Sequence, residues 1–332
     1  MWNDWSFYVI RVLLGLAEAG VYPGVVLFLT WWFPSTYRTR MMAVFQTAST
    51  LSSVIGPPVS AQLLGMNGIL GLMGWQWLFL IEALPAIIMC FVIWFLLTDR
   101  PEDAKWLRPE QREWLSRRLA AERAQRESIR RFRLGETFTN PKVLLLTLAY
   151  VCQTTAGYGA LMFMPLIVRG LDVSQANTGW VTAIPYLCAV VAMNCWGWHS
   201  DKTGERVWHV AGPCLLISAG FGACILIGSS HPVLMLVALC VGVSGRETVS
   251  PLFWSIPSAL LTGTAAAGGI AMINSIGNLG GFIGPWTFGL VKDASGSDNL
   301  ALLVLAAAPL ISVVALLLAG HDPRLERVPP RA

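Results

Sequence analysis

Two ionisable residues stand inside the first long apolar stretch of the chain. Arg11 and Glu18 interrupt a run that is otherwise hydrophobic enough to cross a membrane. A charged side chain at bilayer depth costs at least ~2.5–3.5 kcal/mol on insertion scales, so such residues usually face a protein interior or a watery pathway. On a helix of 3.6 residues per turn, these two side chains share one face and lie roughly 10 Å apart along the axis. A third group, a water molecule or a bound solute fits between them.

The composition indicates a chain that crosses the membrane many times. Of its 332 residues, 55% are hydrophobic and 13% are charged, whereas soluble domains carry about 25% charged residues. The mean hydropathy is +0.59. Nine apolar runs reach the roughly 17–25 residues that a spanning helix needs. They lie near residues 7–31, 41–64, 76–98, 142–168, 177–198, 207–229, 232–255, 262–290 and 299–319.

Positive charge is concentrated on one side of these predicted spans. If residues 99–141 are cytoplasmic, 19 of the 23 Lys and Arg residues fall on cytoplasmic segments, and such a bias marks the cytoplasmic side. We therefore expect a multi-pass protein of a bacterial inner (plasma) membrane with a cytoplasmic C-terminus. All seven Cys lie in apolar segments and the four His do not cluster in the sequence. No disulfide, metal site or cofactor is predicted, and the charge balance gives no support for nucleic-acid binding.

A charged linker divides the predicted spans into a group of three and a group of six. The predicted parts are an N-terminal bundle at 1–98, a cytoplasmic linker at 99–141, a C-terminal six-helix bundle at 142–320 and a cytoplasmic tail at 321–332. In the linker, Pro109 suits the first turn of an amphipathic helix, and Glu113 precedes Arg117 at a stabilising spacing. This helix either lies on the cytoplasmic leaflet or connects the two bundles through solvent, and we favour the connector.

The first three and the last three spans resemble each other. Trp32-Phe33-Pro34-Ser35 and Ile55-Gly56-Pro57 recur as Trp254-Ser-Ile-Pro257-Ser258 and Ile283-Gly284-Pro285. An internal repeat of this type is common in secondary transporters, which are built from paired repeats. Nine spans do not form such pairs. We therefore expect a twelve-span architecture that lacks its first three spans. The alternative is a genuine nine-span protein.

Four stretches of the chain together carry a resemblance to a known family. They are Arg11 to Pro23, Trp75 to Pro85, Gly197 to Arg206 and Thr262 to Pro285. In order, they resemble the fourth span, the sixth span, the second-half loop motif and the eleventh span of the major facilitator superfamily, and within it of the anion:cation symporter family. The tartrate/phthalate-type (aromatic-acid) permease branch is the most similar. The resemblance implies an all-α membrane bundle with about nine transmembrane helices, three plus six, of an expected twelve.

The resemblance implies roles for the two residues of the first span. In relatives, the positions of Arg11 and Glu18 bind the substrate carboxylate and carry the coupled proton. A guanidinium can grip a carboxylate with two parallel hydrogen bonds, and a partly desolvated carboxyl group can exchange a proton nearer to neutral pH than it does in water. The alternative is an interior ion pair that only holds helices together.

Four further residues are candidate substrate contacts. Relatives line their cavity with a Tyr from the region of Tyr158, although an interface aromatic is the alternative. Asn274 and Asn278 share one helix face, and their amides would bind either substrate or neighbouring helices. Arg246 departs from the small neutral residues of relatives. It adds a second cationic contact for a dianion, or it is neutralised by the adjacent Glu247.

The loop between the fifth and sixth predicted spans has the pattern of a conformational latch. Gly197 and Gly204 allow close packing and a tight turn. Asp201 can accept hydrogen bonds from helix N-termini, or pair with Arg206 and with a basic residue across the bundle. Lys202 completes the order Gly, Asp-Lys, Gly, Arg that resembles the superfamily's loop motif. The alternative is a solvated charged loop.

These patterns predict a secondary transporter of a small organic anion, driven by proton symport through alternating access. Tartrate, a sugar acid and an aromatic carboxylate all suit the predicted site. The expected partners are this anion, the coupled proton and the lipid bilayer, and we expect a monomer. No catalytic constellation and no phosphate-binding loop of the ATPase type is visible, so we expect no enzyme. The alternative is a non-transporting sensor or a truncated remnant of such a carrier.

Overall fold

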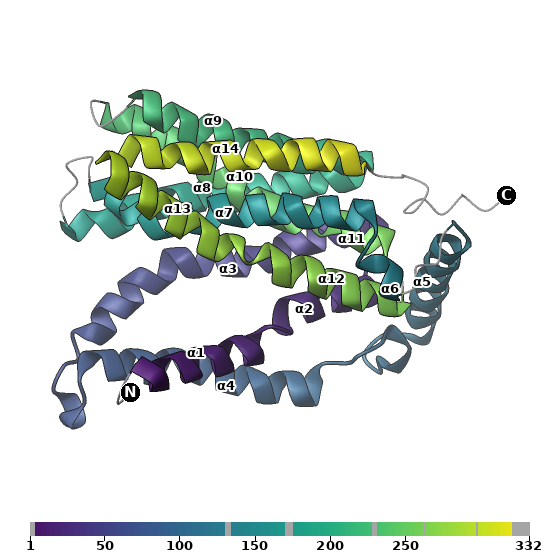
Figure 1. Cartoon of the computed structure of the whole chain (residues 1–332). Coiled ribbons are helices and arrows are strands. Elements are labelled where there is room, and N and C mark those ends of the chain that lie inside the picture. The colour runs from purple at the N-terminus through teal and green to yellow at the C-terminus, as the bar shows by residue number, and fades with distance from the viewer. Residues whose placement is uncertain are drawn as a thin grey trace.

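The computed structural model of the chain describes residues 4–129, 134–169, 175–227, 231–261, 263–296 and 298–320, and these ranges contain helices but no strands (Figure 1). The first half contains α1 (Asp4–Glu18), α2 (Val21–Trp32), α3 (Ser35–Leu64), a 3₁₀ turn at Ile69–Gly71 and α4 (Gly74–Leu96). The linker contains a 3₁₀ turn at Pro101–Asp103, α5 (Pro109–Ile129) and α6 (Leu134–Thr137). The predicted tail at 321–332 lies outside the described residues.

Eight helices form the second half. They are α7 (Pro141–Arg169), α8 (Gln175–Thr203), α9 (Val207–Ile227), α10 (Pro232–Phe253), α11 (Ser255–Leu260), α12 (Gly263–Gly277), α13 (Gly280–Ser295) and α14 (Asp298–Ala319). In Figure 1, α7 to α10, α13 and α14 gather into one bundle, whereas α1 and α4 lie apart from it. No residue of α1 is buried, and Gly74 is the one buried residue of α4.

Eight helical stretches of the described chain are long and apolar enough to cross a membrane. The pairs α1–α2, α10–α11 and α12–α13 each count as one such stretch. The ninth predicted span, near 41–64, is α3, which is 30 residues long but is not among the eight. Its Arg, Ser, Thr and Gln residues lower its hydropathy. Two of those polar residues pair with the second half, against which α3 packs: Thr47 with Asn194 of α8, and Thr50 with Glu247 of α10.

Two of the helix breaks have the same cause. Proline has no N–H, and its ring clashes with the carbonyl group four residues earlier. Pro23 disrupts the helix at Ala19, between α1 and α2, and Pro257 disrupts it at Phe253, between α10 and α11. The break between α12 and α13 has a different origin, because the Thr154 hydroxyl of α7 donates to the carbonyl oxygen of Gly277 there.

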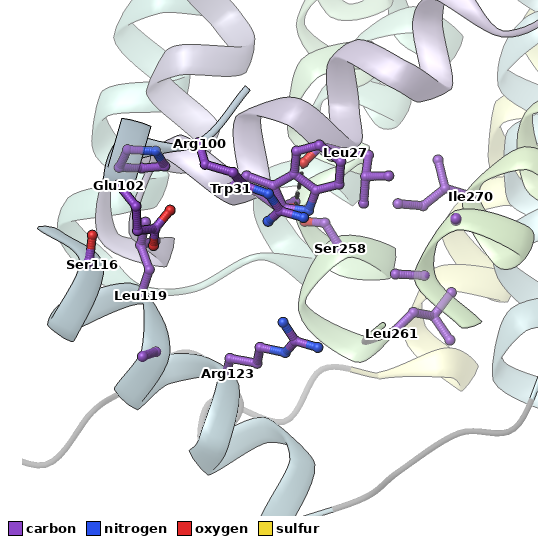
Figure 2. Close-up of a pocket in the computed structure, with 15 residues that line it drawn as sticks. Leu27, Trp31, Arg100, Glu102, Ser116, Leu119, Arg123, Ser258, Leu261 and Ile270 are labelled. Atoms are coloured by element: carbon purple, nitrogen blue, oxygen red, sulfur yellow. Dashed lines mark hydrogen bonds between the residues drawn. The ribbon is translucent and has the colours of Figure 1, made fainter. Parts of the chain in front are cut away.

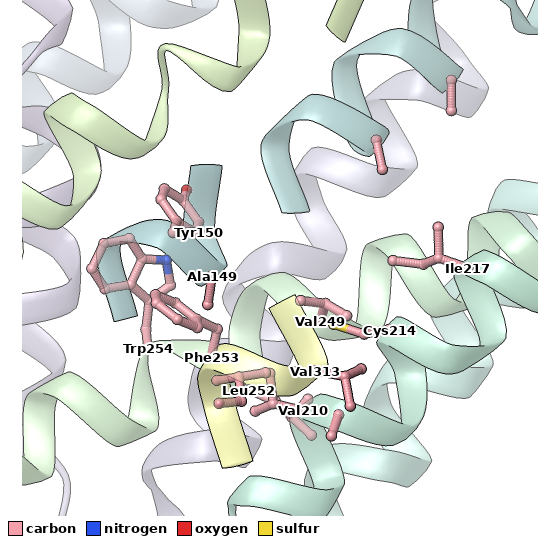
Figure 3. Close-up of a cluster of buried hydrophobic side chains, with 14 of the residues drawn as sticks. Ala149, Tyr150, Val210, Cys214, Ile217, Val249, Leu252, Phe253, Trp254 and Val313 are labelled. Carbon is pink, nitrogen blue, oxygen red and sulfur yellow. The ribbon is translucent and has the colours of Figure 1, made fainter. Parts of the chain in front are cut away.

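The core of the second half is built around three aromatic rings of α7 and α10–α11 (Figure 3). Tyr150 stacks on Phe253 with ring centroids 5.1 Å apart, and its edge meets Trp254 at 5.0 Å. Phe253 and Trp254 are completely buried. Both therefore serve packing, which ties the α10–α11 break to α7.

The linker helix is longer than its sequence pattern indicates and is attached to the first half. It begins at Pro109 as predicted, and the Glu113–Arg117 pair forms at 2.6 Å. The amphipathic pattern in the sequence covers residues 109–119. Beyond it, buried Glu122 accepts a hydrogen bond from the backbone N–H of Ser35 at 3.0 Å. A carboxylate at the N-terminus of α3 satisfies one of its free donors and opposes the helix dipole. This contact favours a connector that docks on a helix end.

A seam of glycines joins α12–α13 to α7. A Cβ atom at Gly277 would lie 2.0 Å from the Tyr150 ring, and one at Gly284 would lie 2.1 Å from the carbonyl oxygen of Thr155. Gly280 faces Thr154 at a similar distance. Gly280 and Gly284 are four residues apart, a small-residue spacing that allows close helix packing.

Replacement of Gly284 by Ala should destabilise the second half. The added methyl group would overlap the α7 backbone, and overpacking of this kind typically costs about 1–3 kcal/mol. The measurement is the thermal unfolding midpoint in detergent, with Gly289→Ala as the matched control, because a Cβ atom there, on the same helix, meets nothing within 4 Å. Equal midpoints for the two variants would contradict the tight seam.

Candidate functional site

A cavity of about 610 Å³ lies between the two halves. Helices α1, α2 and α3 line it from the first half, and α7, α10 and α12 line it from the second. Its polar and charged lining residues are Glu18, Tyr22, Gln46, Ser49, Ser53, Tyr150, Gln153, Thr154, Tyr158, Arg246, Glu247, Ser250, Asn274 and Asn278. Such a cavity is large enough for a small-molecule ligand.

The structure brings five of the sequence-predicted site residues to this cavity. Glu18, Tyr158, Arg246, Asn274 and Asn278 all line it. They come from four helical stretches that are far apart in the sequence. The fold therefore brings residues that were selected by their type into one cavity.

Arg11 is not among the residues that line the cavity. Its guanidinium carbon lies 5.2 Å from the ring centroid of Phe7, one turn earlier on the same exposed helix. Glu18 reaches the cavity because it ends α1, where the chain bends toward α2. The two residues share a helix side, but only the one at the break reaches the cavity wall.

Arg246 and Glu247 form an ion pair in the cavity wall. The Glu247 side chain is 6% exposed and that of Arg246 is 26% exposed. The guanidinium lies against Gly157 of α7, where a Cβ atom would sit 2.6 Å from Arg246 Nε. The second oxygen of Glu247 accepts a hydrogen bond from Thr50 Oγ1 of α3 at 3.0 Å. The pair therefore joins the two halves.

Two buried amides that the sequence analysis did not single out also line the cavity. Gln46 is 8% exposed and Gln153 is 6% exposed. Within the described part of the chain, neither Oε1 atom has a hydrogen-bond partner, although Gln153 Nε2 donates to Ser312 at 3.0 Å. Unpaired buried acceptors are costly. Both Oε1 atoms are themselves buried, so a ligand with hydroxyl donors would pair with them once the amide groups turned toward the cavity. The sequence signal that could have identified them is a single Gln within each apolar run.

The predicted latch loop contacts the start of α3. Arg206 is 2% exposed. Its Nη1 donates to Asp201 Oδ1 and to Thr39 Oγ1, both at 2.6 Å, and its Nη2 donates to the carbonyl oxygen of Ser35 at 3.1 Å. The backbone N–H of Arg40 donates to Asp201 Oδ2 at 2.7 Å. The charged pair thus holds the ends of the two halves together.

The other members of the loop pattern have separate roles. Gly204 adopts a φ of +69°, which favours glycine. A Cβ atom at Gly197 would meet that of Ala43 on α3 at 3.2 Å, so this position sets the approach of α8 to α3. Lys202 lies over the Trp198 ring of its own helix at 5.1 Å.

Two histidines meet next to the latch. His199 Nδ1 and His209 Nε2 lie 2.7 Å apart, and His209 Nδ1 lies 2.7 Å from Glu205 Oε2. The histidines are dispersed in the sequence, and these two meet because the end of α8 and the start of α9 fold back on each other. Across the described residues, no group of three His, Cys, Asp or Glu is arranged to hold a metal ion.

A second cavity of about 510 Å³ lies where α2 meets the linker and α11–α12 (Figure 2). Arg100 covers the ring of Trp31 at 3.8 Å in a cation–π contact. Glu102 and Arg123 also line this cavity. It contains none of the sequence-predicted site residues, so the interhalf cavity is the better candidate site.

Comparison with known proteins places these features in a family. The sequence pattern described as Major Facilitator Superfamily matches residues 1–285. A candidate tartrate transporter of Agrobacterium vitis is 44% identical over 320 residues, which cover 96% of this chain and 71% of the relative. A quinolone resistance transporter of Acinetobacter baumannii is 35% identical over 311 residues, 93% of this chain and 71% of the relative.

A solved structure gives the same fold. The chain superposes on the proton:xylose symporter XylE, bound to 6-bromo-6-deoxy-D-glucose, with a TM-score of 0.71 over 91% of this chain and 69% of that one. The identity is 14%, so this likeness concerns the fold alone. The family match, the relatives and the helices agree, and this chain is a multi-pass membrane protein that belongs to the major facilitator superfamily of transporters.

Proposed function

We propose that this protein carries a small hydroxylated organic anion, such as tartrate, across the membrane together with protons. The observation that carries the proposal is the convergence, in one interhalf cavity, of a cation, an exposed acid and unpaired amide acceptors. Arg246 would bind a carboxylate, and Gln46 and Gln153 would accept from hydroxyl groups. The 44% identity to a candidate tartrate transporter supports the same substrate class.

The two bundles, residues 1–98 and 142–320, would rock about this cavity, with residues 99–141 as the linker. The Asp201–Arg206 pair would latch one state, because it binds the start of α3 from the other half. We further propose a bacterial inner membrane location, a cytoplasmic C-terminus and a monomer. The role that the resemblance implies for Arg11 would require α1 to turn its guanidinium toward the cavity.

The test of this function is uptake of labelled L-tartrate by the purified chain in proteoliposomes. An inward-directed proton gradient should drive accumulation above equilibrium, and a protonophore should abolish it. Equal accumulation with and without the gradient would overturn the proton coupling. Transport of a quinolone without transport of any hydroxy acid would overturn the substrate class.

Glu18→Gln should lower gradient-driven accumulation but leave tartrate exchange between the two sides. The amide keeps the shape of Glu18 at the cavity wall but cannot take up a proton. The measurement compares accumulation with counterflow in the same vesicles. Glu82→Gln is the matched control, because Glu82 is an acid of a spanning helix that accepts from Ser60 at 2.7 Å and does not line the cavity. Full accumulation by Glu18→Gln would remove Glu18 as a proton site.

Gln46→Met should weaken binding of tartrate about fivefold to tenfold and leave succinate, which has no hydroxyl groups, unaffected. The substitution keeps the side-chain length but removes the acceptor, and a hydrogen bond contributes about 1 kcal/mol. Competition of each acid against labelled tartrate gives the two affinities. Gln62→Met, at an exposed position elsewhere on α3, should leave both affinities unchanged. Equal losses for the two acids would show that Gln46 does not read hydroxyl groups.

Asp201→Asn should lower the tartrate uptake rate at least tenfold and change the binding affinity by no more than about twofold. Buried Arg206 would lose its counter-charge, which is strongly destabilising for the latched state, whereas the latch is remote from the cavity. Uptake rate and equilibrium binding are measured on the same preparation. Lys202→Gln serves as control, since Lys202 lies on Trp198. Parallel losses of rate and affinity would argue against a latch.

A further inference from the structure

Glu247 uses its two oxygens on opposite sides of the cavity interface. One oxygen accepts from Arg246, its neighbour on α10, and the other accepts from Thr50 of α3 at 3.0 Å. Thr50 is 1% exposed. An anion in this position is therefore held by one group from each half of the protein.

The bond between Arg246 and Glu247 is not a product of the helix itself. Consecutive residues on a helix point in different directions and do not face each other. Arg246 has to fold back to reach Glu247, and it does so across Gly157, the position where a side chain would collide with the guanidinium. A guanidinium has five N–H donors, and this one lines the cavity with 26% of its side chain exposed. A ligand carboxylate can thus approach the same cation.

We propose that Glu247 is an internal competitor of the substrate, occupying Arg246 in the empty cavity and releasing it when Glu247 takes up a proton. The inference rests on the proposed function and names its binding switch. Arg246 is partly buried, and a cation withdrawn from water to this extent is stabilised by one anion beside it. Either ionised Glu247 or a substrate carboxylate meets that need, so neutralisation of Glu247 by one proton makes room for one carboxylate. The proton comes from cavity water and leaves with the substrate.

Both protonation states of Glu247 have hydrogen-bond partners in place. Thr50 Oγ1 lies 3.0 Å from Glu247 Oε2 and 3.3 Å from the backbone carbonyl oxygen of Gln46. Its single hydrogen can point to ionised Glu247, or it can point to Gln46 while protonated Glu247 donates to Thr50. The threonine hydroxyl therefore has a hydrogen-bond acceptor in both protonation states of Glu247.

The surroundings single out Glu247 as the acid that competes for Arg246. Among the described residues that line the cavity, Arg246 is the one cation, and α3 contributes the neutral Gln46 to the lining and the neutral Thr50 beside Glu247. The other titratable groups that face the pair are the phenols of Tyr22, Tyr150, Tyr158 and Tyr186 from α2, α7 and α8. Glu18 of α1 is exposed at the same cavity.

The decisive experiment measures L-tartrate binding by calorimetry in detergent between pH 6 and pH 8. Tartrate is ionised throughout this range, because carboxyl groups of this type titrate near pH 3–4. The wild-type Kd should rise by up to about tenfold per pH unit for each proton that binding requires. Glu247→Gln should bind at least tenfold more tightly than wild type at pH 8. The slope of log Kd against pH should be smaller by one than in wild type. The number of protons taken up per tartrate bound, obtained from the binding heats in two buffers, should also be smaller by one.

The outcomes separate the two proposals. Glu18→Gln is the control and should keep the one-proton dependence that Glu247→Gln loses. If wild type binds tartrate and Glu247→Gln keeps the full pH dependence of the wild-type Kd, the role of Glu247 as a competitor is overturned and the proposed function is retained. If wild type binds no tartrate at any pH, both fall.

A second pair of variants tests the switch without leaving Arg246 unpaired. Thr50→Val removes a donor to ionised Glu247, so the pH at which tartrate binding weakens should move upward. Thr47→Val is matched to it, since Thr47 lies on the same helix but accepts from Asn194 of α8 at 2.8 Å. An unshifted profile in Thr50→Val, or equal shifts in both variants, would overturn the role of Glu247.

Discussion

A charge that cannot reach water must find its counter-charge and its hydrogen-bond partners inside the protein. This constraint organises the interface between the two halves. Arg206 is held by Asp201 and by Thr39, and the Arg246–Glu247 pair is held by Thr50. In both places the charged pair belongs to the second half and the neutral partner belongs to α3. Among the described long helices outside the linker, α3 is the least apolar, and its position between the halves fits the groups that it has to satisfy.

Much of this arrangement could be predicted from the sequence, because long-range patterns express it. Apolar run lengths gave the spanning helices, and the order of glycines and charges between α8 and α9 indicated the contact that Asp201 and Arg206 make. Glu18 and Arg246 were found because charges are rare in apolar runs. Glu18 reaches the cavity where α1 breaks before Pro23, whereas Arg246 reaches it from within α10.

Other features depend on side-chain geometry that spacing does not encode. Arg11 shares a helix face with Glu18, but only the residue at the end of α1 meets the cavity. In the sequence, Gln46 and Gln153 look like any polar residue in a span. Only the structure shows that their side-chain Oε1 atoms are buried and have no hydrogen-bond partner among the described residues. His199 and His209 meet only because a left-handed Gly204 reverses the chain. The run at 41–64 was predicted only as one of the spans, and its contacts through Thr47 and Thr50 with polar groups of the second half were not foreseen.

The glycine seam between α7 and α12–α13 has a mechanical consequence. Backbone atoms interlock there at Gly280 and Gly284, so the helices cannot slide or rotate past one another without first separating. They must travel as one piece during any change of state. Relative motion is then confined to interfaces that are held by side chains. The main one is the interface of α3, where hydrogen bonds can be exchanged one at a time. A stiff bundle of this kind converts the exchange of a few hydrogen bonds at its edge into the displacement of a whole cavity wall.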